Sequence, residues 1–170
     1  MTEHHLWAPW RHDYITRDES VEEASESSGC FICDYLKRPE EEDRSNLVLL
    51  RSDPCVVLLN RFPYNNGHLL VAPQRHAGEL ADLTPEEHLA CMQLLTRLAG
   101  IISEQMSADG FNIGLNLGRV AGAGLPGHLH WHLVPRWNGD TNFMPVIADT
   151  KVIPQALDSL YELLCRNLGN

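Results

Sequence analysis

The sequence is poor in basic residues, since 13 lysines and arginines stand against 23 aspartates and glutamates, and its net charge is −10. A protein that holds nucleic acid by its phosphates needs a basic surface, so we expect no nucleic-acid partner. No run approaches the roughly 18 apolar residues of a membrane span. The start, MTEHHLWAPW, also lacks the pattern of a secretory signal. We therefore expect a cytoplasmic protein with no membrane partner.

Cysteine is scarce and odd in number, with five residues: Cys30, Cys33, Cys55, Cys91 and Cys165. This number suits a reducing compartment better than a disulfide framework. Cys30 and Cys33 form a Cys-x-x-Cys pair, which can bind one metal ion through two thiolates. Ordinary core cysteines are the alternative interpretation of this pair.

The familiar motifs for phosphate binding are missing. Residues 122–127 match G-x-G-x-x-G letter for letter, but Pro126 and a predicted strand follow, where the dinucleotide motif requires a helix. There is also no Gly-Lys-Ser/Thr of a P-loop. What remains is a glycine-rich loop whose backbone amides could approach phosphate oxygens.

The length of 170 residues predicts one folded domain. Residues 1–29 are expected to form an arm followed by an acidic linker, and residues 30–170 the domain. Apolar runs separated by turn formers predict strands at 47–51, 55–61 and 68–73 in an antiparallel meander, and a fourth strand at 111–117. A capping box at Thr84 predicts a long helix that ends at Gly110, with Leu89, Met92, Leu95, Leu98, Ile102 and Met106 as its buried stripe. A terminal helix is expected over 154–168.

The stretch 127–137, GHLHWHLVPRW, has histidines at alternate positions, His128, His130 and His132. In an extended strand these three imidazoles project from one face, while the apolar residues between them face a core. Polar rings in a row are costly to bury without partners. They therefore indicate a functional site rather than a chance histidine-rich surface.

A neutral imidazole is a competent nucleophile toward phosphorus. The attacking nitrogen must be free, so a fixed acceptor such as a backbone carbonyl should hold the proton on the other ring nitrogen. The transferred group carries negative oxygens that need positioned donors. The cluster contains no carboxylate, which suits an anionic substrate better than a two-metal phosphodiesterase.

The pattern from His128 to Val134 resembles that of the histidine triad (HIT) family. The stretch NRFPYNNGHLLVAP resembles the strand–loop–strand of that family, and LWAPWR and PRWNGDTNF resemble its diadenosine tetraphosphate phosphorylase and hydrolase branch. The resemblance runs from Cys30 to about Arg136. It implies an α+β fold, in which an antiparallel sheet carries one long helix and a C-terminal helix, and it implies a homodimer.

The resemblance also implies roles for four histidines. His130 would be the nucleophile that takes a nucleoside monophosphate at its α-phosphate. The main-chain carbonyl of His128 would orient His130, while His132 and His68 would contact the phosphate or the leaving group. The substrate would be a dinucleoside polyphosphate or a related nucleoside phosphate derivative.

Four further positions are expected to bind the nucleotide. By resemblance, Asn60 matches a position that holds the ribose hydroxyls, and Asn116 matches a polar position that contacts phosphate. Gly122 and Gly124 would offer backbone amides. The sequence departs from several branches at Gly124 and Leu125, where a polar Gln-Ser or Gln-Thr pair precedes the triad. A side-chain donor is therefore missing there, and either loop amides replace it or the acceptor is phosphate rather than water.

A structural zinc site is also implied, because some relatives combine a Cys-x-x-Cys pair with two histidines. Here the set would be Cys30, Cys33, His76 and His128, a closed tetrahedral site. In the alternative, His76 simply caps the end of a strand at the surface.

The sequence thus predicts a nucleotidyl hydrolase or transferase that works through a nucleotidyl-histidine. A nucleotide-binding sensor with negligible turnover would use the same pocket and is the alternative. A catalytic zinc held directly by the three triad histidines is disfavoured, because alternate residues of a strand lie about 6–7 Å apart.

Overall fold

The computed structural model describes residues 29–148 and 152–169. The arm and acidic linker predicted for residues 1–29 therefore lie outside the described residues, Gly29 excepted. Within the described ranges, no helix is long and apolar enough to cross a membrane.

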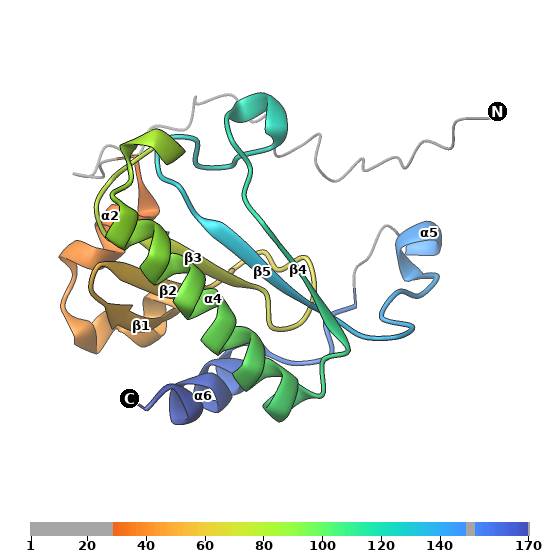
Figure 1. Ribbon diagram of the computed structural model, residues 1–170. Coiled ribbons are helices and arrows are strands. Elements are labelled where there is room, and N and C mark those ends of the chain that lie inside the picture. Colours follow the sequence, from red (N-terminus) through yellow and green to blue (C-terminus); the bar gives the residue numbers. More distant parts are fainter. Residues whose placement is uncertain (1–28, 149–151, 170) are drawn as a thin grey trace.

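The centre of the fold is one antiparallel sheet with the strand order β1-β2-β3-β5-β4 (Figure 1). Its strands are β1 (Val48–Ser52), β2 (Cys55–Leu59), β3 (Leu69–Pro73), β4 (Gly110–Gly114) and β5 (Trp131–Arg136). The predicted meander of the first three strands and the predicted α+β class are confirmed. Strand β5 comes last in sequence but pairs between β3 and β4, which brings the histidine stretch beside His68.

Helices cover both faces of the sheet. Besides short 3-10 turns, the helices are α2 (Phe31–Lys37), α3 (Asp43–Asn46), α4 (Pro85–Met106), α5 (Met144–Ala148) and α6 (Leu157–Leu168). Helices α4 and α6 bury the larger core against one face, and α2 buries a smaller cluster around Ile32 against the other. Figure 1 shows α4 lying across the sheet with α6 beside it.

Helix α4 begins as predicted and ends earlier. Thr84 and Glu87 form the capping box, and Pro85 opens the helix. The helix stops at Met106, because Ser107 takes a left-handed conformation with φ of 51°. The residue predicted to end the helix, Gly110, instead begins β4.

The buried stripe of α4 also differs from the predicted one. Leu89 and Met92 are exposed, whereas Cys91 and Leu94 are buried together with the predicted Leu95, Leu98 and Ile102. Both sets have helical spacing, and only the tilt of the helix on the sheet decides between them.

Further element boundaries were misplaced, and β2 ends at Leu59 rather than at residue 61. Strand β4 ends at Gly114 rather than at residue 117. It is an edge strand, and its Ile113 is half exposed. Helix α6 begins at Leu157, three residues after Pro154. Its predicted Leu160, Leu164 and Leu168 are buried.

An ionic cluster fastens the loop before β3 to the end of β5. Asp140 accepts hydrogen bonds from the guanidinium of Arg136, at 2.8 Å for Nη2, and from Nδ2 of Asn65 at 2.8 Å. The same Nδ2 reaches the carbonyl of Pro135 at 3.1 Å. The Asp140 side chain is only 8% exposed, and the adjacent Arg136 lowers the pKa of its carboxyl group to about 2.

We expect Asp140→Asn to lower the free energy of unfolding by about 1–2 kcal/mol at pH 7. The pKa of Asp140 is depressed by folding, so its contribution is full above pH 4 and is lost as the pH falls from about 4 to about 2. Urea unfolding of wild type and variant across this range measures the difference. Glu104→Gln, which changes an exposed carboxylate of α4, is the control. A difference that persists unchanged at pH 2 would contradict this account.

Candidate functional site

Strand register places the histidines on one face of the sheet. Leu70 of β3 pairs with His132 of β5, and Val71 pairs with Trp131. Leu129, Trp131 and Leu133 are buried in the core under α4, so the alternating histidines project from the opposite face. The regular strand begins at Trp131, and His128 and His130 lie in the extended segment before it.

His130 lies in the middle of this row and is 9% exposed. Its Nδ1 donates a hydrogen bond to the carbonyl of His128 at 2.8 Å. A carbonyl oxygen can only accept, so Nδ1 carries the proton and Nε2 keeps its lone pair. Burial lowers the pKa of His130 below its usual value. The imidazole is therefore neutral at pH 7, with one nucleophilic nitrogen.

A second pair of imidazoles joins β3 to β5. The backbone amide of Tyr64 donates to Nδ1 of His68 at 2.9 Å, so the ring proton of a neutral His68 lies on Nε2. That nitrogen lies 2.9 Å from Nδ1 of His132 and donates to it. The remaining nitrogen of a neutral His132 then carries its proton. The row of imidazoles therefore ends in an N–H group of His132 that can donate to a negatively charged oxygen.

Asn60 and Tyr64 border this pair. The carboxamide nitrogen of Asn60 lies 3.3 Å from Nδ1 of His68, and its oxygen accepts the amide of Phe62 at 2.9 Å. The ring of Tyr64 stacks on His132, with 5.6 Å between ring centroids and 22° between planes. The loop 60–67 thus carries several of the groups that fix the two histidines.

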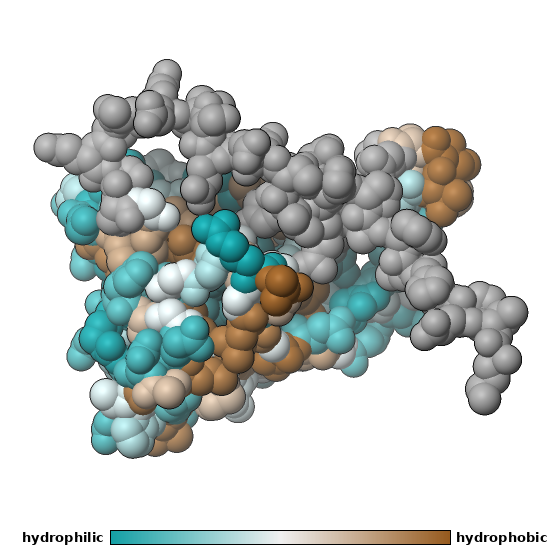
Figure 2. Space-filling model, turned by 90° about the horizontal axis from the view of Figure 1, so that it is seen from above, coloured by the Kyte–Doolittle hydropathy of each residue, from teal (hydrophilic) through white to brown (hydrophobic). Residues whose placement is uncertain are grey.

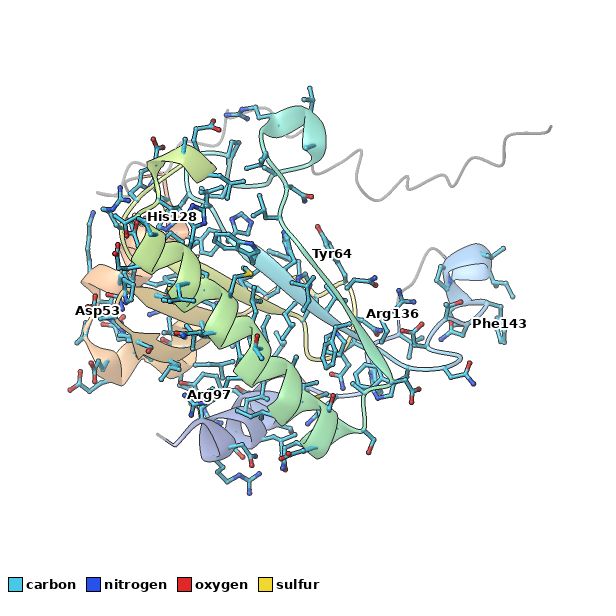
Figure 3. The ribbon with its side chains drawn as sticks, viewed as in Figure 1. Asp53, Tyr64, Arg97, His128, Arg136 and Phe143 are labelled. Atoms are coloured by element: carbon cyan, nitrogen blue, oxygen red, sulfur yellow. The ribbon has the colours of Figure 1, made fainter. Side chains whose placement is uncertain are left out.

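His128 turns away from this pair toward α2. Its Nε2 donates to the carbonyl of Pro73 at 2.8 Å, which leaves Nδ1 facing Sγ of Cys30 at 3.2 Å and Sγ of Cys33 at 3.5 Å. His76 reaches the same Cys33 Sγ through Nδ1 at 3.3 Å. Figure 3 shows His128 and Tyr64 at opposite ends of the site.

These four side chains, Cys30, Cys33, His76 and His128, form a cluster whose ligand atoms all lie within 4.8 Å of one another. Two thiols and two imidazole nitrogens are the donor set of a closed tetrahedral zinc site. Each histidine offers a nitrogen, and Pro73 supplies the outer hydrogen bond typical of ligating histidines. Burial and the hydrogen bond to Cys30 raise the pKa of Cys33 to about 11, so metal binding would release a proton there.

The other predicted nucleotide-binding residues lie in the loop between β4 and β5. Nδ2 of Asn116 donates to the carbonyl of Gly122 at 3.3 Å. Gly122 has φ of 85° and ends a short 3-10 turn, while Gly124 is exposed. No contact between these three residues and the histidines is among the interactions described for residues 29–148.

Two contributors were not found from the sequence. Tyr64 fixes His68 through its backbone amide and touches His132 with its ring, and Pro73 accepts from His128. Backbone groups have no residue signature. The one available signal was the position of Tyr64, four residues before His68 in a loop of turn formers, which could have indicated a role for Tyr64 in fixing His68.

Comparison with known proteins fits this geometry. The family model for the HIT domain matches residues 41–139. A protein named AP-4-A phosphorylase from Mycobacterium tuberculosis is 40% identical over 159 residues, which are 94% of this chain and 81% of that protein.

Two further comparisons extend this match. An asymmetrical bis(5'-nucleosyl)-tetraphosphatase from Schizosaccharomyces pombe is 36% identical over 55% of this chain and 50% of its own. The crystal structure of a zinc-bound histidine triad family protein from Mycobacterium smegmatis superposes with a TM-score of 0.59 at 27% identity, over 72% of this chain and 84% of that one. The chain belongs to the histidine triad (HIT) family.

Proposed function

We propose that this protein is a nucleotidyltransferase that cleaves dinucleoside polyphosphates through a covalent nucleotidyl-histidine on His130. The observation that carries the proposal is the hydrogen bond from His130 Nδ1 to the His128 carbonyl, which leaves Nε2 as a neutral nucleophile. The names of the relatives from M. tuberculosis and S. pombe support this substrate class.

In the first step, Nε2 of His130 attacks the α-phosphorus. A nitrogen–phosphorus bond forms as the bond to the bridging oxygen breaks, and the rest of the polyphosphate leaves with the electron pair. Charge gathers on the phosphoryl oxygens and on the departing oxygen. His132, held by His68, supplies an N–H donor for this charge. In the second step an oxygen nucleophile attacks phosphorus, and His130 is released.

We assign the nucleotide to the side of the row that carries Asn60. Because Asn60 lies beside His68, a ribose bound to its carboxamide would put the α-phosphate near His130 and His132. Asn116 and the amides of Gly122 and Gly124 would close over the phosphates from the β4–β5 loop. The hydrogen bond between Asn116 and Gly122 supports a joint role of the two residues.

The second nucleophile is assigned to inorganic phosphate. The M. tuberculosis relative, similar over most of both chains, is named a phosphorylase. Gly124 and Leu125 also lack the side-chain donors found before the triad in several branches. Attack by phosphate yields a nucleoside diphosphate, and attack by water yields a nucleoside monophosphate.

Product analysis on diadenosine tetraphosphate tests the proposed function. With phosphate present we expect ATP and ADP, and without phosphate we expect slow formation of ATP and AMP or none. Chromatography after a fixed time, with ¹⁸O-labelled phosphate as a tracer, distinguishes the two routes. AMP as the product at every phosphate concentration would identify a hydrolase. Stoichiometric nucleotide binding without any product would identify the sensor alternative.

We also propose that Cys30, Cys33, His76 and His128 hold a structural Zn²⁺. Support comes from the convergence of their ligand atoms and from the zinc-bound relative of known structure. Four protein ligands leave no open position, so the ion would take no part in the reaction. Its task would be to fix His128, whose carbonyl orients His130.

We further propose a homodimer, and the exposed apolar surface supports it. Strand β4 is an edge of the sheet, and Ile113 on it is half exposed. Unpaired edges of this kind invite pairing with another chain. Phe143, Val146 and Ile147 of and before α5 are each more than 60% exposed. Figure 2 shows apolar side chains gathered there at one end of the molecule, where a second copy would cover them.

We place the protein in the cytoplasm. All five cysteines are free thiols. Cys55 and Cys91 lie 3.3 Å apart without a bond between them. A reducing compartment preserves both this pair and the thiols of the metal cluster.

A further inference from the structure

A cavity of about 540 Å³ lies away from the histidines, where α4 ends beside α6. Its walls come from five parts of the chain: the loop before β3, the end of α4, the turn after β5, the segment leading into α6 and α6 itself. Its polar lining is made by Asn65, Asn66, Gln105, Trp137, Asp140 and Gln155, and Leu163 adds an apolar side chain from α6. This volume is within the range of about 300–1,000 Å³ typical of small-molecule sites.

The cavity is separate from the site described above. Helices α4 and α6 cover the sheet face that buries Leu129, Trp131 and Leu133, and the histidines project from the other face. None of the four histidines of the active site lines the cavity, and neither do the metal-cluster cysteines.

Carboxamides dominate the polar lining. The Nδ2 group of Asn65 is already used within the protein, because it donates to the Pro135 carbonyl and to Asp140. Asn66 is 8% exposed and donates through Nδ2 to Oε1 of Gln155 at 3.3 Å, while its Oδ1 has no hydrogen-bond partner in the described part of the chain. A buried acceptor without a partner is costly. Since Asn66 lines the cavity, Oδ1 is the acceptor that a donor on a ligand there would satisfy.

Gln155 complements this acceptor. Its oxygen is occupied by Asn66, so its Nε2 hydrogens are the groups it can offer to a ligand. One carboxamide acceptor beside one carboxamide donor matches the paired donor and acceptor on the edge of a nucleobase, as asparagine and glutamine match adenine. Trp137 adds an indole, held in place by donation from Nε1 to the Met106 carbonyl at 2.9 Å.

The charge of the described lining disfavours phosphorylated ligands. Among residues 29–148 and 152–169, Asp140 is the only charged residue that lines the cavity, and none of the lining residues there is a lysine, arginine or histidine. A phosphate would meet a carboxylate without a compensating cation in the wall, since the guanidinium of Arg136 is already bonded to Asp140. Because Arg136 also neutralises Asp140, the described lining offers a cation no net charge, and it favours an uncharged ligand.

We propose that this cavity binds an uncharged nucleobase or nucleoside, recognised by the carboxamides of Asn66 and Gln155 and the indole of Trp137. The site shares a loop with the active site. Asn65 and Asn66 directly follow Tyr64, whose amide fixes His68. A ligand that holds Asn66 in place favours this loop geometry, so it strengthens nucleotide binding, and nucleotide strengthens its binding equally. This coupling, unlike the site itself, rests on the proposed function.

Adenosine titrated into ¹⁵N-labelled protein with saturating AMP tests the site, and AMP alone is the reference. The side-chain amides of Asn66, Gln105 and Gln155 and the indole N–H of Trp137 give separate signals. We expect adenosine, added once AMP has saturated the active site, to shift these signals saturably, whereas further AMP should not shift them. Leu163→Trp, which fills the cavity from α6, should weaken adenosine binding at least tenfold, and Gln155→Leu should weaken it severalfold. Ser159→Trp, an exposed indole on the same helix, should leave it unchanged.

Two results would overturn the proposal: no shift of the cavity signals by adenosine, or the same affinity in wild type and Leu163→Trp. Equal shifts produced by AMP added beyond saturation of the active site would refute the charge argument and the ligand class with it. The signals are read residue by residue and need no turnover, so a failed activity assay would count against the proposed function and not against this site.

Discussion

Replacing His130 by asparagine is expected to lower kcat on diadenosine tetraphosphate by about 10⁴-fold or more. Asparagine has no nitrogen that can form a stable bond to phosphorus, so both steps of the reaction are lost. The Kd of AMP should change only a few fold, because the remaining phosphate donors, His132 and His68, stay in place. Turnover and calorimetric binding measure the two effects separately.

Chemical trapping makes this prediction specific for covalent catalysis. Wild-type protein quenched during turnover of labelled substrate should carry one nucleotide per chain in an acid-labile, base-stable bond, as a phosphoramidate requires. The His130→Asn variant should carry none. His88→Asn on α4, where the ring bonds to the Leu80 carbonyl far from the triad, controls for the loss of an imidazole. Covalently bound nucleotide on the His130→Asn variant would refute the mechanism. Turnover by the wild type with no trapped nucleotide would also refute it.

Loss of the metal cluster is expected to have the largest effect on stability. Structural zinc contributes about 10–16 kcal/mol in zinc-finger peptides. Even a third of this would lower the melting temperature of a domain of this size by about 10 °C or more. Cys30→Ser should cause this loss, and it should also lower kcat because His128 then no longer holds the carbonyl that orients His130.

Zinc analysis and thermal unfolding check this together. Wild type and Cys165→Ser, which changes a thiol on α6 outside the cluster, should retain one zinc per chain and the same melting temperature. Cys30→Ser should contain no zinc. Addition of zinc to the wild-type apoprotein should restore the original melting temperature. If chelation left the melting temperature unchanged, the cluster would not need a metal ion for the stability of the protein, and this prediction would be wrong.

The sequence predicted the parts of the fold that depend on local pattern. The capping box placed the start of α4 at Thr84, and turn formers separated the strands of the meander. It misplaced the end of α4. The helix ends where Ser107 takes a left-handed conformation, and serine is not a residue type that marks a helix end in a sequence. Leu89 and Met92 were assigned to the core because helical spacing alone does not give the rotation of a helix about its axis.

The sequence identified the candidate residues of the site, but it did not predict most of the contacts between them. Alternation identified His128, His130 and His132, and family resemblance added His68, Asn60 and His76. The pairing of β3 with β5, which brings His68 within 2.9 Å of His132 across 64 positions of sequence, follows from sheet topology. The cavity beside α6 had no sequence signal at all, since its lining residues come from stretches that meet only in the folded chain.

Both hydrogen bonds that set the protonation of His128 and His130 end on main-chain carbonyls, those of Pro73 and His128. A carbonyl survives any exchange of its side chain, so alanine at position 73 would leave its acceptor in place, while alanine at position 128 would be scored through the lost metal ligand and not through the acceptor. The tautomers on which the proposed chemistry depends are thereby shielded from most point mutations. The changes that reach them are those that move the backbone itself, such as loss of a metal ligand, insertions, shifted strand pairing or an ester in place of an amide.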